Sequence, residues 1–403
     1  MSRPLSPTAA FAGLAAIFAA FFFAAGAPTP LLSVRQQEWG FSAGTLTFAF
    51  SVYALGLLVA LLVGGSLSDH LGRRPVLVAA LAGELLSMVG FLAAPDIGWV
   101  IVARAVQGIA TGLATSAFSA AIVEHAPAHL KKLAGGLAAA SVAGGLALGA
   151  LATGAAVQFT PIANTIVFGA LTLVMALAIV FVALTGETSS RRPGAWRSLT
   201  PRISIPGNVR AEFLAGIPVH VAAWMTPAFF LGLSPAVLRL HFGLDGGLVT
   251  GFTAFLGPFV AAVSSFYFAG HPARRSTIAG KTLVLLGMVV VVIGVLTTAL
   301  PVLWLGAVVG GLGFGGAFGG QLRLIVPHIQ PEDRAGVFAG IYTVAYLSFG
   351  VPVIVAGQLA ARWGLIPTFE LYAGALIVIA ALSIVVQTGL GRRESTRPAA
   401  VSA

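Results

Sequence analysis

Long apolar segments of about twenty residues recur along the whole chain and restrict its fold more than any other feature. A helix needs about 20 residues to cross the roughly 30 Å hydrocarbon core of a membrane. Strands of membrane barrels alternate polar and apolar residues, whereas these segments are apolar throughout. Twelve such segments occur, at residues 9–32, 44–67, 76–94, 98–122, 134–157, 163–184, 213–238, 247–269, 277–299, 302–325, 336–360 and 367–389. We therefore predict an all-α polytopic membrane protein with twelve transmembrane helices.

Composition excludes the water-soluble classes of protein. Hydrophobic residues make up 58% of the 403 residues and charged residues only 8%, whereas about 25% of the residues of a soluble domain are charged. A soluble enzyme, a coiled coil and a disordered scaffold are excluded on these grounds. The chain has no cysteine, which also excludes a small secreted domain held by disulfides.

The net charge of +10 is explained by membrane topology. Basic residues collect in the cytoplasmic loops of membrane proteins. With a cytoplasmic N-terminus, three arginines fall outside (Arg35, Arg239 and Arg362), and Arg104 falls within a span. The other basic residues are then cytoplasmic: Arg3, Arg73, Arg74, Lys131, Lys132, Arg191, Arg192, Arg197, Arg202, Arg210, Arg274, Arg275, Lys281, Arg323, Arg334, Arg392, Arg393 and Arg397. We expect both termini in the cytoplasm and no nucleic-acid partner.

An internal repeat divides the chain into two halves. The polar stretch Gly186–Arg210 separates six spans from six, and His70–Arg74 matches His271–Arg275 at an offset of 201 residues. Ala134–Gly135 matches Ala335–Gly336 at the same offset, and Trp39–Phe41 matches Phe242–Leu244 at the close offset of 203 residues. We predict an N-terminal six-helix bundle at 1–185, a cytoplasmic basic linker at 186–212, a second six-helix bundle at 213–391 and a cytoplasmic tail at 392–403. Parallel repeats of this kind place a solute site near the membrane midplane, between the halves.

Two motifs link the sequence to a known family. The loop after the second span contains Gly65, Asp69, Gly72, Arg73 and Arg74 in the pattern Gly-x-x-x-Asp-basic-x-Gly-basic-basic, with His70 at the first basic position. The fourth span contains Arg104-x-x-Gln107-Gly108-x-x-x-Gly112. Both resemble signature motifs of the major facilitator superfamily. The resemblance implies the major facilitator fold, in which two pseudo-symmetric six-helix bundles alternately expose a central site.

The same resemblance implies a gating latch on the cytoplasmic side. Asp69 would cap the start of the eleventh span, while Arg73 or Arg74 would pair with Glu124 at the end of the fourth. Topogenic charge alone also explains the two arginines, but not Asp69 with its glycine spacing. The repeated loop has Gly270 in place of the acid, so we expect one full latch. Its residues would be Gly65, Asp69, Gly72, Arg73, Arg74 and Glu124.

A few polar groups within the spans are candidates for function. By the resemblance, Arg104 faces the central cavity, although an arginine at this depth can also snorkel to the outer surface. Glu84 in the third span is a candidate proton carrier, or forms a structural pair with Arg104. His220 is a second candidate, because an imidazole changes charge near neutral pH. The expected cavity residues are Arg104, Gln107, Glu84, His220, Trp224, Tyr342 and Tyr346.

Glycines at 144, 145, 149 and 154 of the fifth span resemble a motif of drug:proton antiporters, and close helix packing explains them equally well.

Phosphate-loop and metal-cluster patterns are missing from the sequence, so we expect no enzyme and no cofactor or metal. We expect a monomeric transporter of the inner membrane that exports a small organic or amphipathic compound, coupled to protons. Uptake or exchange of an organic anion, with Arg104 as counter-charge, is the alternative. A receptor or channel is a third possibility.

Overall fold

Helices provide all the regular structure of residues 6–201, 203–330 and 333–395, which the computed structural model describes. Arg3, Arg202, Arg397 and the predicted tail after Ser395 lie outside these residues. In chain order the elements are α1 Pro7–Gly26, α2 Pro28–Trp39, α3 Ala43–Gly64, α4 Leu67–Leu71, α5 Arg73–Ala93, α6 Ile97–His125, α7 Lys131–Phe159, α8 Ala163–Leu184, α9 Ala195–Ser198, α10 Gly207–Ala228, the π-helix η1 Phe229–Leu233, α11 Ser234–Leu240, α12 Gly247–Ala269, α13 Ala273–Leu296, α14 Leu300–Ile325, the 3₁₀-helix η2 Val326–His328, α15 Arg334–Trp363 and α16 Leu365–Ser395.

The twelve predicted spans are confirmed: twelve helical segments among the described residues are long and apolar enough to cross a membrane. Two of them are longer than predicted. The first runs from Thr8 to Trp39 through α1 and α2, and the seventh runs from Gly207 to Leu240 through α10, η1 and α11. The helices continue there into polar residues, such as Arg35–Glu38. A prediction based on hydropathy does not count such residues as part of a span.

Prolines interrupt both of these long spans. Pro28 has no backbone N–H to donate to the carbonyl four residues earlier, and α1 gives way to α2 at Ala27. In the seventh span, Pro227 and Pro235 flank the fully buried π-helical turn η1. Such turns are uncommon and often lie at functional sites.

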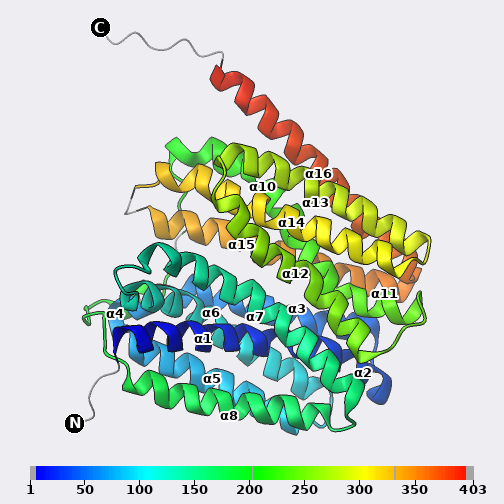
Figure 1. Cartoon of the computed structure of the whole chain (residues 1–403), viewed down its shortest axis with the longest axis horizontal. Helices are drawn as coiled ribbons and strands as arrows, with labels where there is room; N and C mark the ends of the chain where they lie inside the picture. The colour runs from blue at the N-terminus through cyan, green and yellow to red at the C-terminus, as the bar shows by residue number, and fades with distance from the viewer. Residues whose placement is uncertain (1–5, 202, 331–332, 396–403) are drawn as a thin grey trace.

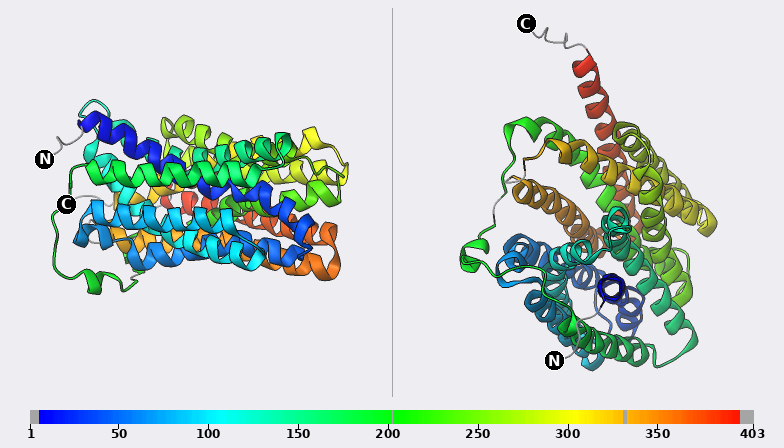
Figure 2. Two further views of the ribbon diagram at one scale, coloured as in Figure 1. Left: turned by 90° about the horizontal axis from the view of Figure 1, so that it is seen from below. Right: turned by 60° about the vertical axis from the view of Figure 1, so that its left-hand side comes forward.

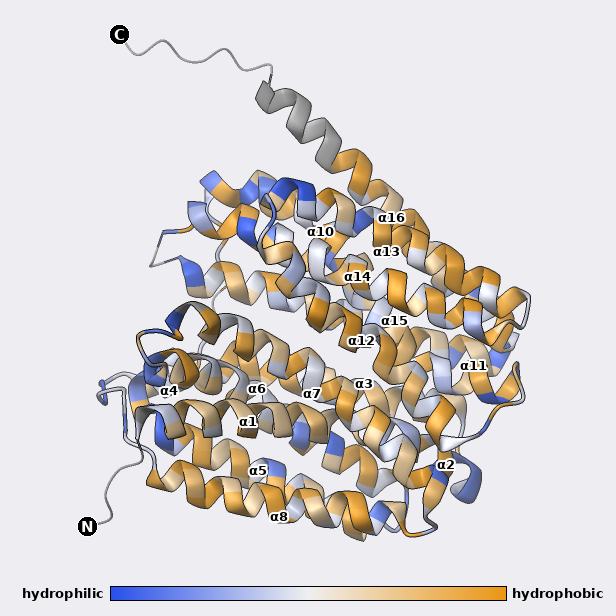
Figure 3. Cartoon of the chain, viewed as in Figure 1, coloured by the Kyte–Doolittle hydropathy of each residue, from blue (hydrophilic) through white to orange (hydrophobic). Residues whose placement is uncertain are grey.

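The helices form two bundles, α1–α8 and α10–α16, seen below and above the centre of Figure 1. At one end, which we call the linker face, lie α4 and the start of α1 from the first bundle, the starts of α10 and α15 from the second, and the 185–201 segment. At the opposite end, the far face, lie α2, α11 and the 40–42 and 241–246 loops. Hydrophilic residues concentrate toward these two ends (Figure 3). The repeat extends to the backbone, since Gly40 and Gly243 have the same φ of +68°.

The two bundles meet closely at the far face. Helix α7 packs along α12, and α3 packs along α15. A Cβ atom added to Gly154 of α7 would lie 2.7 Å from the Cα atom of Gly251 in α12, so the two backbones touch there. Arg239 of α11 also donates a 2.6 Å hydrogen bond from Nη2 to Oε1 of Gln36 in α2. The far face is therefore closed in this structure.

Gly154→Ala should loosen this closure, because its methyl group would collide with the α12 backbone. Cysteines placed at Gln36 and Arg239 provide the measurement, and the chain has no other cysteine to interfere. We expect Gly154→Ala to slow cross-linking of this pair by a short bifunctional thiol reagent severalfold.

Gly144→Ala on the same helix is the control, since a Cβ there would meet nothing within 4 Å. Equal cross-linking rates in the two variants would contradict a far face closed by glycine contact.

Candidate functional site

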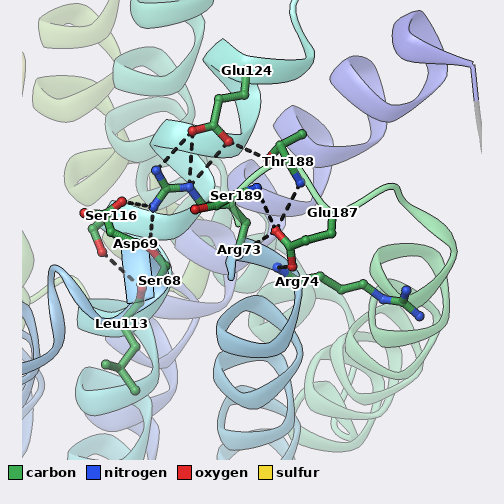
Figure 4. Close-up of polar contacts among 10 residues, drawn as sticks. All are labelled: Ser68, Asp69, Arg73, Arg74, Leu113, Ser116, Glu124, Glu187, Thr188 and Ser189. Carbon is green, nitrogen blue, oxygen red and sulfur yellow. Dashed lines mark hydrogen bonds and ion pairs between the residues drawn. The ribbon is translucent and has the colours of Figure 1, made fainter. Parts of the chain in front are cut away.

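Arg73 is the centre of a charge network at the linker face (Figure 4). It stands at the start of α5, and its guanidinium pairs with Glu124 near the end of α6 at 3.0 Å. The same group pairs with Asp69 of α4 and donates a 2.7 Å hydrogen bond to Ser68 Oγ. Three elements of the first bundle are thus joined through one side chain. Of the two arginines that were candidates for pairing with Glu124, the structure selects Arg73, and the side chain of Arg74 extends away (Figure 4).

Among the described residues, no contact of this network reaches the second bundle. Asp69 was expected to cap the eleventh span, but its polar contact here is with Arg73, and its side chain is 52% exposed. The eleventh span, α15, begins at Arg334 with Asp333 as its preceding residue. Gly65 marks the end of α3 next to this network. The latch between bundles is therefore not engaged in this conformation, with the far face closed.

A second acid, which the sequence analysis missed, holds the start of α5. Glu187 follows α8 and accepts hydrogen bonds from the backbone N–H groups of Arg73 at 2.8 Å and Arg74 at 3.1 Å. Gly72 makes this possible: its φ is +97°, and a Cβ on it would lie 2.6 Å from Glu187 Oε2. Thr188 donates a 2.5 Å hydrogen bond to Glu124. Glu187 lies 114 residues from Arg73, so no local pattern in the sequence could have indicated it.

Glu187→Ala should lower the free energy of unfolding by about 1 kcal/mol, the usual contribution of a helix N-cap. Glu187→Gln should cost less, because its amide oxygen still accepts a hydrogen bond. Thermal unfolding of the purified protein in detergent measures both changes.

The control is Glu38→Ala, which removes an acid from the partly exposed Arg35–Glu38 pair; such surface pairs contribute only about 0–1 kcal/mol. If Glu187→Gln proved as costly as Glu187→Ala, the capping role would be wrong.

Arg104 lies buried inside the first bundle, with 2% of its surface exposed. Its guanidinium donates hydrogen bonds to the carbonyl oxygens of Ala25 in α1 at 3.1 Å and of Phe50 in α3 at 3.1 Å. It also lies over the ring of Tyr53, 4.4 Å from the ring centre. A cation in this position is satisfied by carbonyl dipoles and an aromatic face. Snorkelling to the far face is excluded.

Gln107 stands between Arg104 and Glu84. Its Oε1 atom accepts a 2.7 Å hydrogen bond from Arg104, while its Nε2 atom donates to Glu84 Oε1 at 3.0 Å. Nε2 also donates to the carbonyl of Ala24, which Pro28 leaves without its usual helical partner. Among the described residues no ion pair joins Glu84 to Arg104. The direct pair, one of the two alternatives for Glu84, is therefore replaced by a bridge through an amide.

Gln107→Leu should destabilise the protein by about 2 to 5 kcal/mol, because it leaves the buried side chains of Arg104 and Glu84 each short of a hydrogen-bond partner. Thermal or urea unfolding in detergent measures this loss. Gln37→Leu, the same change at an exposed position of α2, should leave stability unchanged. Equal stability of the two variants would show that the bridge contributes nothing.

The second bundle contains its own buried polar groups. His220 of α10 is 1% exposed and packs edge-on against Phe318 of α14, with ring centres 5.4 Å apart. Lys281, counted among the basic residues of the cytoplasmic side, is 1% exposed within α13 and donates a hydrogen bond to the carbonyl of Ser383 in α16. It begins the third turn of α13, toward the linker-face end of the ninth span.

A cavity of about 340 Å³ lies between the two bundles. Trp224, Tyr342 and Tyr346 line it, and the rings of Trp224 and Tyr346 are 5.0 Å apart. Its walls come from α6, α7, α10, η1, α12, α14 and α15, and no Asp, Glu, Lys, Arg or His is among the described residues that line it. Arg104, Gln107, Glu84 and His220 do not line this cavity. The residues expected at one site thus separate into an aromatic group in the cavity and a polar group behind its walls.

The cavity occupies the linker-face part of the interface. Its lining residues on α7 lie between Gly136 and Leu146, and those on α12 lie between Gly257 and Ala269. Because the two helices run in opposite directions, both stretches belong to the half of the helix nearer the linker face. Pockets of about 300–1,000 Å³ with apolar and aromatic walls are typical of small-molecule sites.

Two six-helix bundles with a cavity between them, closed at one membrane face, define a transporter fold. The family model of the Major Facilitator Superfamily matches residues 13–351, and the chain belongs to this superfamily. The predicted membership and fold are confirmed.

Similar proteins include several transporters. The chain is 25% identical over 292 residues, 69% of each chain, to the multidrug resistance protein MdtL of Shewanella sp.. It is 34% identical over 82 residues to the inner membrane transport protein YnfM of Escherichia coli, and 37% identical over 68 residues to the multidrug transporter mfsB of Aspergillus fumigatus. These two matches cover 20% and 17% of this chain but only 19% and 10% of the relatives' own lengths.

Solved structures share the fold at low sequence identity. A bacterial homologue of the human lysosomal transporter Spinster, in an inward-facing and unoccupied conformation, superposes with a TM-score of 0.74 at 14% identity, over 96% of this chain and 98% of that one. The human organic anion transporter MFSD10 gives a TM-score of 0.69 at 16% identity, over 94% and 99%.

Proposed function

We propose that this transporter exports a small, uncharged or weakly charged aromatic or amphipathic compound by alternating access. The observation that carries the proposal is the character of the cavity between the bundles. Its walls present Trp224, Phe230, Phe314, Tyr342 and Tyr346 and no charged side chain among the described residues. Such walls favour flat apolar solutes through ring stacking and the burial of apolar surface.

The direction of export rests on the orientation of the protein in the membrane. Basic residues of the linker face, such as Arg73, Arg191 and Arg274, support a cytoplasmic location for this face through the positive-inside rule. Both termini are then cytoplasmic, and the cavity belongs to an inward-facing state that loads from the cytoplasm or the inner leaflet. The likeness to an inner membrane transport protein and to multidrug transporters supports an inner-membrane exporter.

Protons are the coupling ion in this proposal. A secondary transporter needs a gradient to move its solute uphill, and ionisable groups buried within the spans are where a proton can be carried. Glu84 and His220 are such groups, and each has ring or carboxylate atoms without a hydrogen-bond partner in the protein. The halves 1–185 and 213–391 are the bodies that move as a monomer in the bilayer, joined by the linker 186–212.

Uptake of an organic anion is less well supported by the cavity. That alternative assigned Arg104 as the counter-charge, but the guanidinium is enclosed by carbonyl oxygens of α1 and α3. A solute in the cavity would meet no cation on the described walls.

The test is accumulation of the aromatic dye Hoechst 33342 in proteoliposomes with an imposed pH gradient. We expect Trp224→Ala to reduce the initial rate at least tenfold, because this ring packs against three rings of two other walls, Phe314 of α14 and Tyr346 and Phe349 of α15. Trp196→Ala removes a tryptophan that is 87% exposed in α9 and should leave the rate unchanged.

Anionic dyes serve as the contrasting probe in the same vesicles. Transport of anionic dyes alone, lost in Arg104→Ala, would overturn export of an uncharged aromatic compound in favour of the anion alternative.

A further inference from the structure

Helix α10 presents a stripe of four residues, spaced four apart, to its neighbour α14. Residues at this spacing lie on one face of a helix. Glu212 accepts a 3.2 Å hydrogen bond from Gln321 Nε2, and a Cβ on Gly216 would lie 2.8 Å from the same atom. One and two turns further along, His220 and Trp224 pack edge-on against Phe318, with ring centres 5.4 Å and 5.5 Å apart. We call this row, with Gln321, the α10 stripe.

The two ends of the α10 stripe reach different surroundings. Glu212 is half-buried in the second turn of α10, at the linker face. Trp224 lies 12 residues further along and lines the cavity between the bundles. At a rise of 1.5 Å per residue, the stripe spans about 18 Å. It therefore runs behind the aromatic wall of the cavity, from the linker face to the middle of the second bundle.

Polar atoms without partners in the protein gather along this stripe. Both ring nitrogens of His220, Nε1 of Trp224 and Oε1 of Gln321 are buried and accept or donate no hydrogen bond within the protein. Buried polar groups are nearly always hydrogen-bonded, and water supplies the bond where the protein does not. A row of four such atoms can hold a chain of hydrogen-bonded water molecules, along which a proton can move.

Charged groups face the middle of the stripe. Lys281 of α13 acts electrostatically on both His220 and Glu212. Tyr342 and Tyr346 of α15 form the opposite wall, next to Trp224. No other Asp, Glu, Lys, Arg or His of the described helices is recorded in contact with His220. His220 is thus the one imidazole between an acid at the linker face and the cavity.

We propose that the α10 stripe is a proton path, in which His220 takes up and releases the transported proton. A proton taken up by the carboxylate of Glu212 passes through water molecules held along the stripe, beside Gln321 Oε1, to one ring nitrogen of His220, giving an imidazolium. The proton on the other ring nitrogen then passes to water near Trp224 and the cavity, which restores the neutral ring. Only O–H and N–H bonds form and break, and each group returns to its starting protonation state. This inference rests on the proposed proton-coupled export and names the residues that carry the proton.

The first experiment measures coupling in proteoliposomes with Hoechst 33342. His220→Asn should reduce accumulation driven by a pH gradient at least tenfold while leaving exchange of dye across the membrane without a gradient within twofold. Glu212→Gln should slow accumulation in the same way, because an amide cannot carry the proton. His271→Asn, at an exposed histidine of the linker face, is the control and should accumulate dye normally. Full accumulation by His220→Asn would overturn the proposal.

The second experiment needs no substrate and separates this inference from the proposed function. Protein labelled with ¹⁵N-histidine is reconstituted in lipid, and the His220 signals are assigned by their loss in His220→Asn. We expect ring-nitrogen signals that exchange with water and shift with pH between about pH 4 and pH 8. Signals that do neither would overturn the proton path even if dye export is confirmed. Should the wild-type protein move no dye, the export proposal fails and these signals alone decide the proton path.

Discussion

The buried guanidinium of Arg104 organises the first bundle. A charge at this depth in a bilayer costs several kcal/mol unless dipoles surround it. The structure supplies them from three helices: carbonyl oxygens of α1 and α3 and the amide of Gln107 in α6. A further carbonyl at the α1–α2 break, released by Pro28, holds Gln107 in place. One arginine thus fixes the relative positions of the helices next to the interface between bundles, and its environment keeps it out of the cavity.

The sequence was sufficient for the fold because the signals for it are local or periodic. Twelve apolar segments, basic loops and a 201-residue offset need no knowledge of packing, and the limits of most spans agree with the structure within a few residues. Gly40 and Gly243, which are matched in the repeat, even share a backbone conformation. The predicted limits of a span were wrong where the helix continues beyond its apolar residues, as at Arg35–Glu38.

The candidate site was less accessible from sequence, because it depends on which side of a helix faces which neighbour. Trp224, Tyr342 and Tyr346 do line the cavity, but Arg104 and Glu84 belong to a polar cluster behind it. Glu187 holds the start of α5 from 114 residues away, and Lys281 is held by a carbonyl of α16 that lies 102 residues further along the chain. Long-range contacts of this kind leave no periodic trace in the chain.

The glycine contact at the far face has a consequence for the barrier between conformations. Where Gly154 meets Gly251, the two backbones touch, so separating them at this point exposes little side-chain surface. Parting the bundles must in addition break the Arg239–Gln36 hydrogen bond and separate the rings of Phe50 and Phe349. The barrier therefore combines polar and aromatic contacts between the bundles with the glycine contact, while Asp69 at the linker face stays half exposed and free to exchange partners.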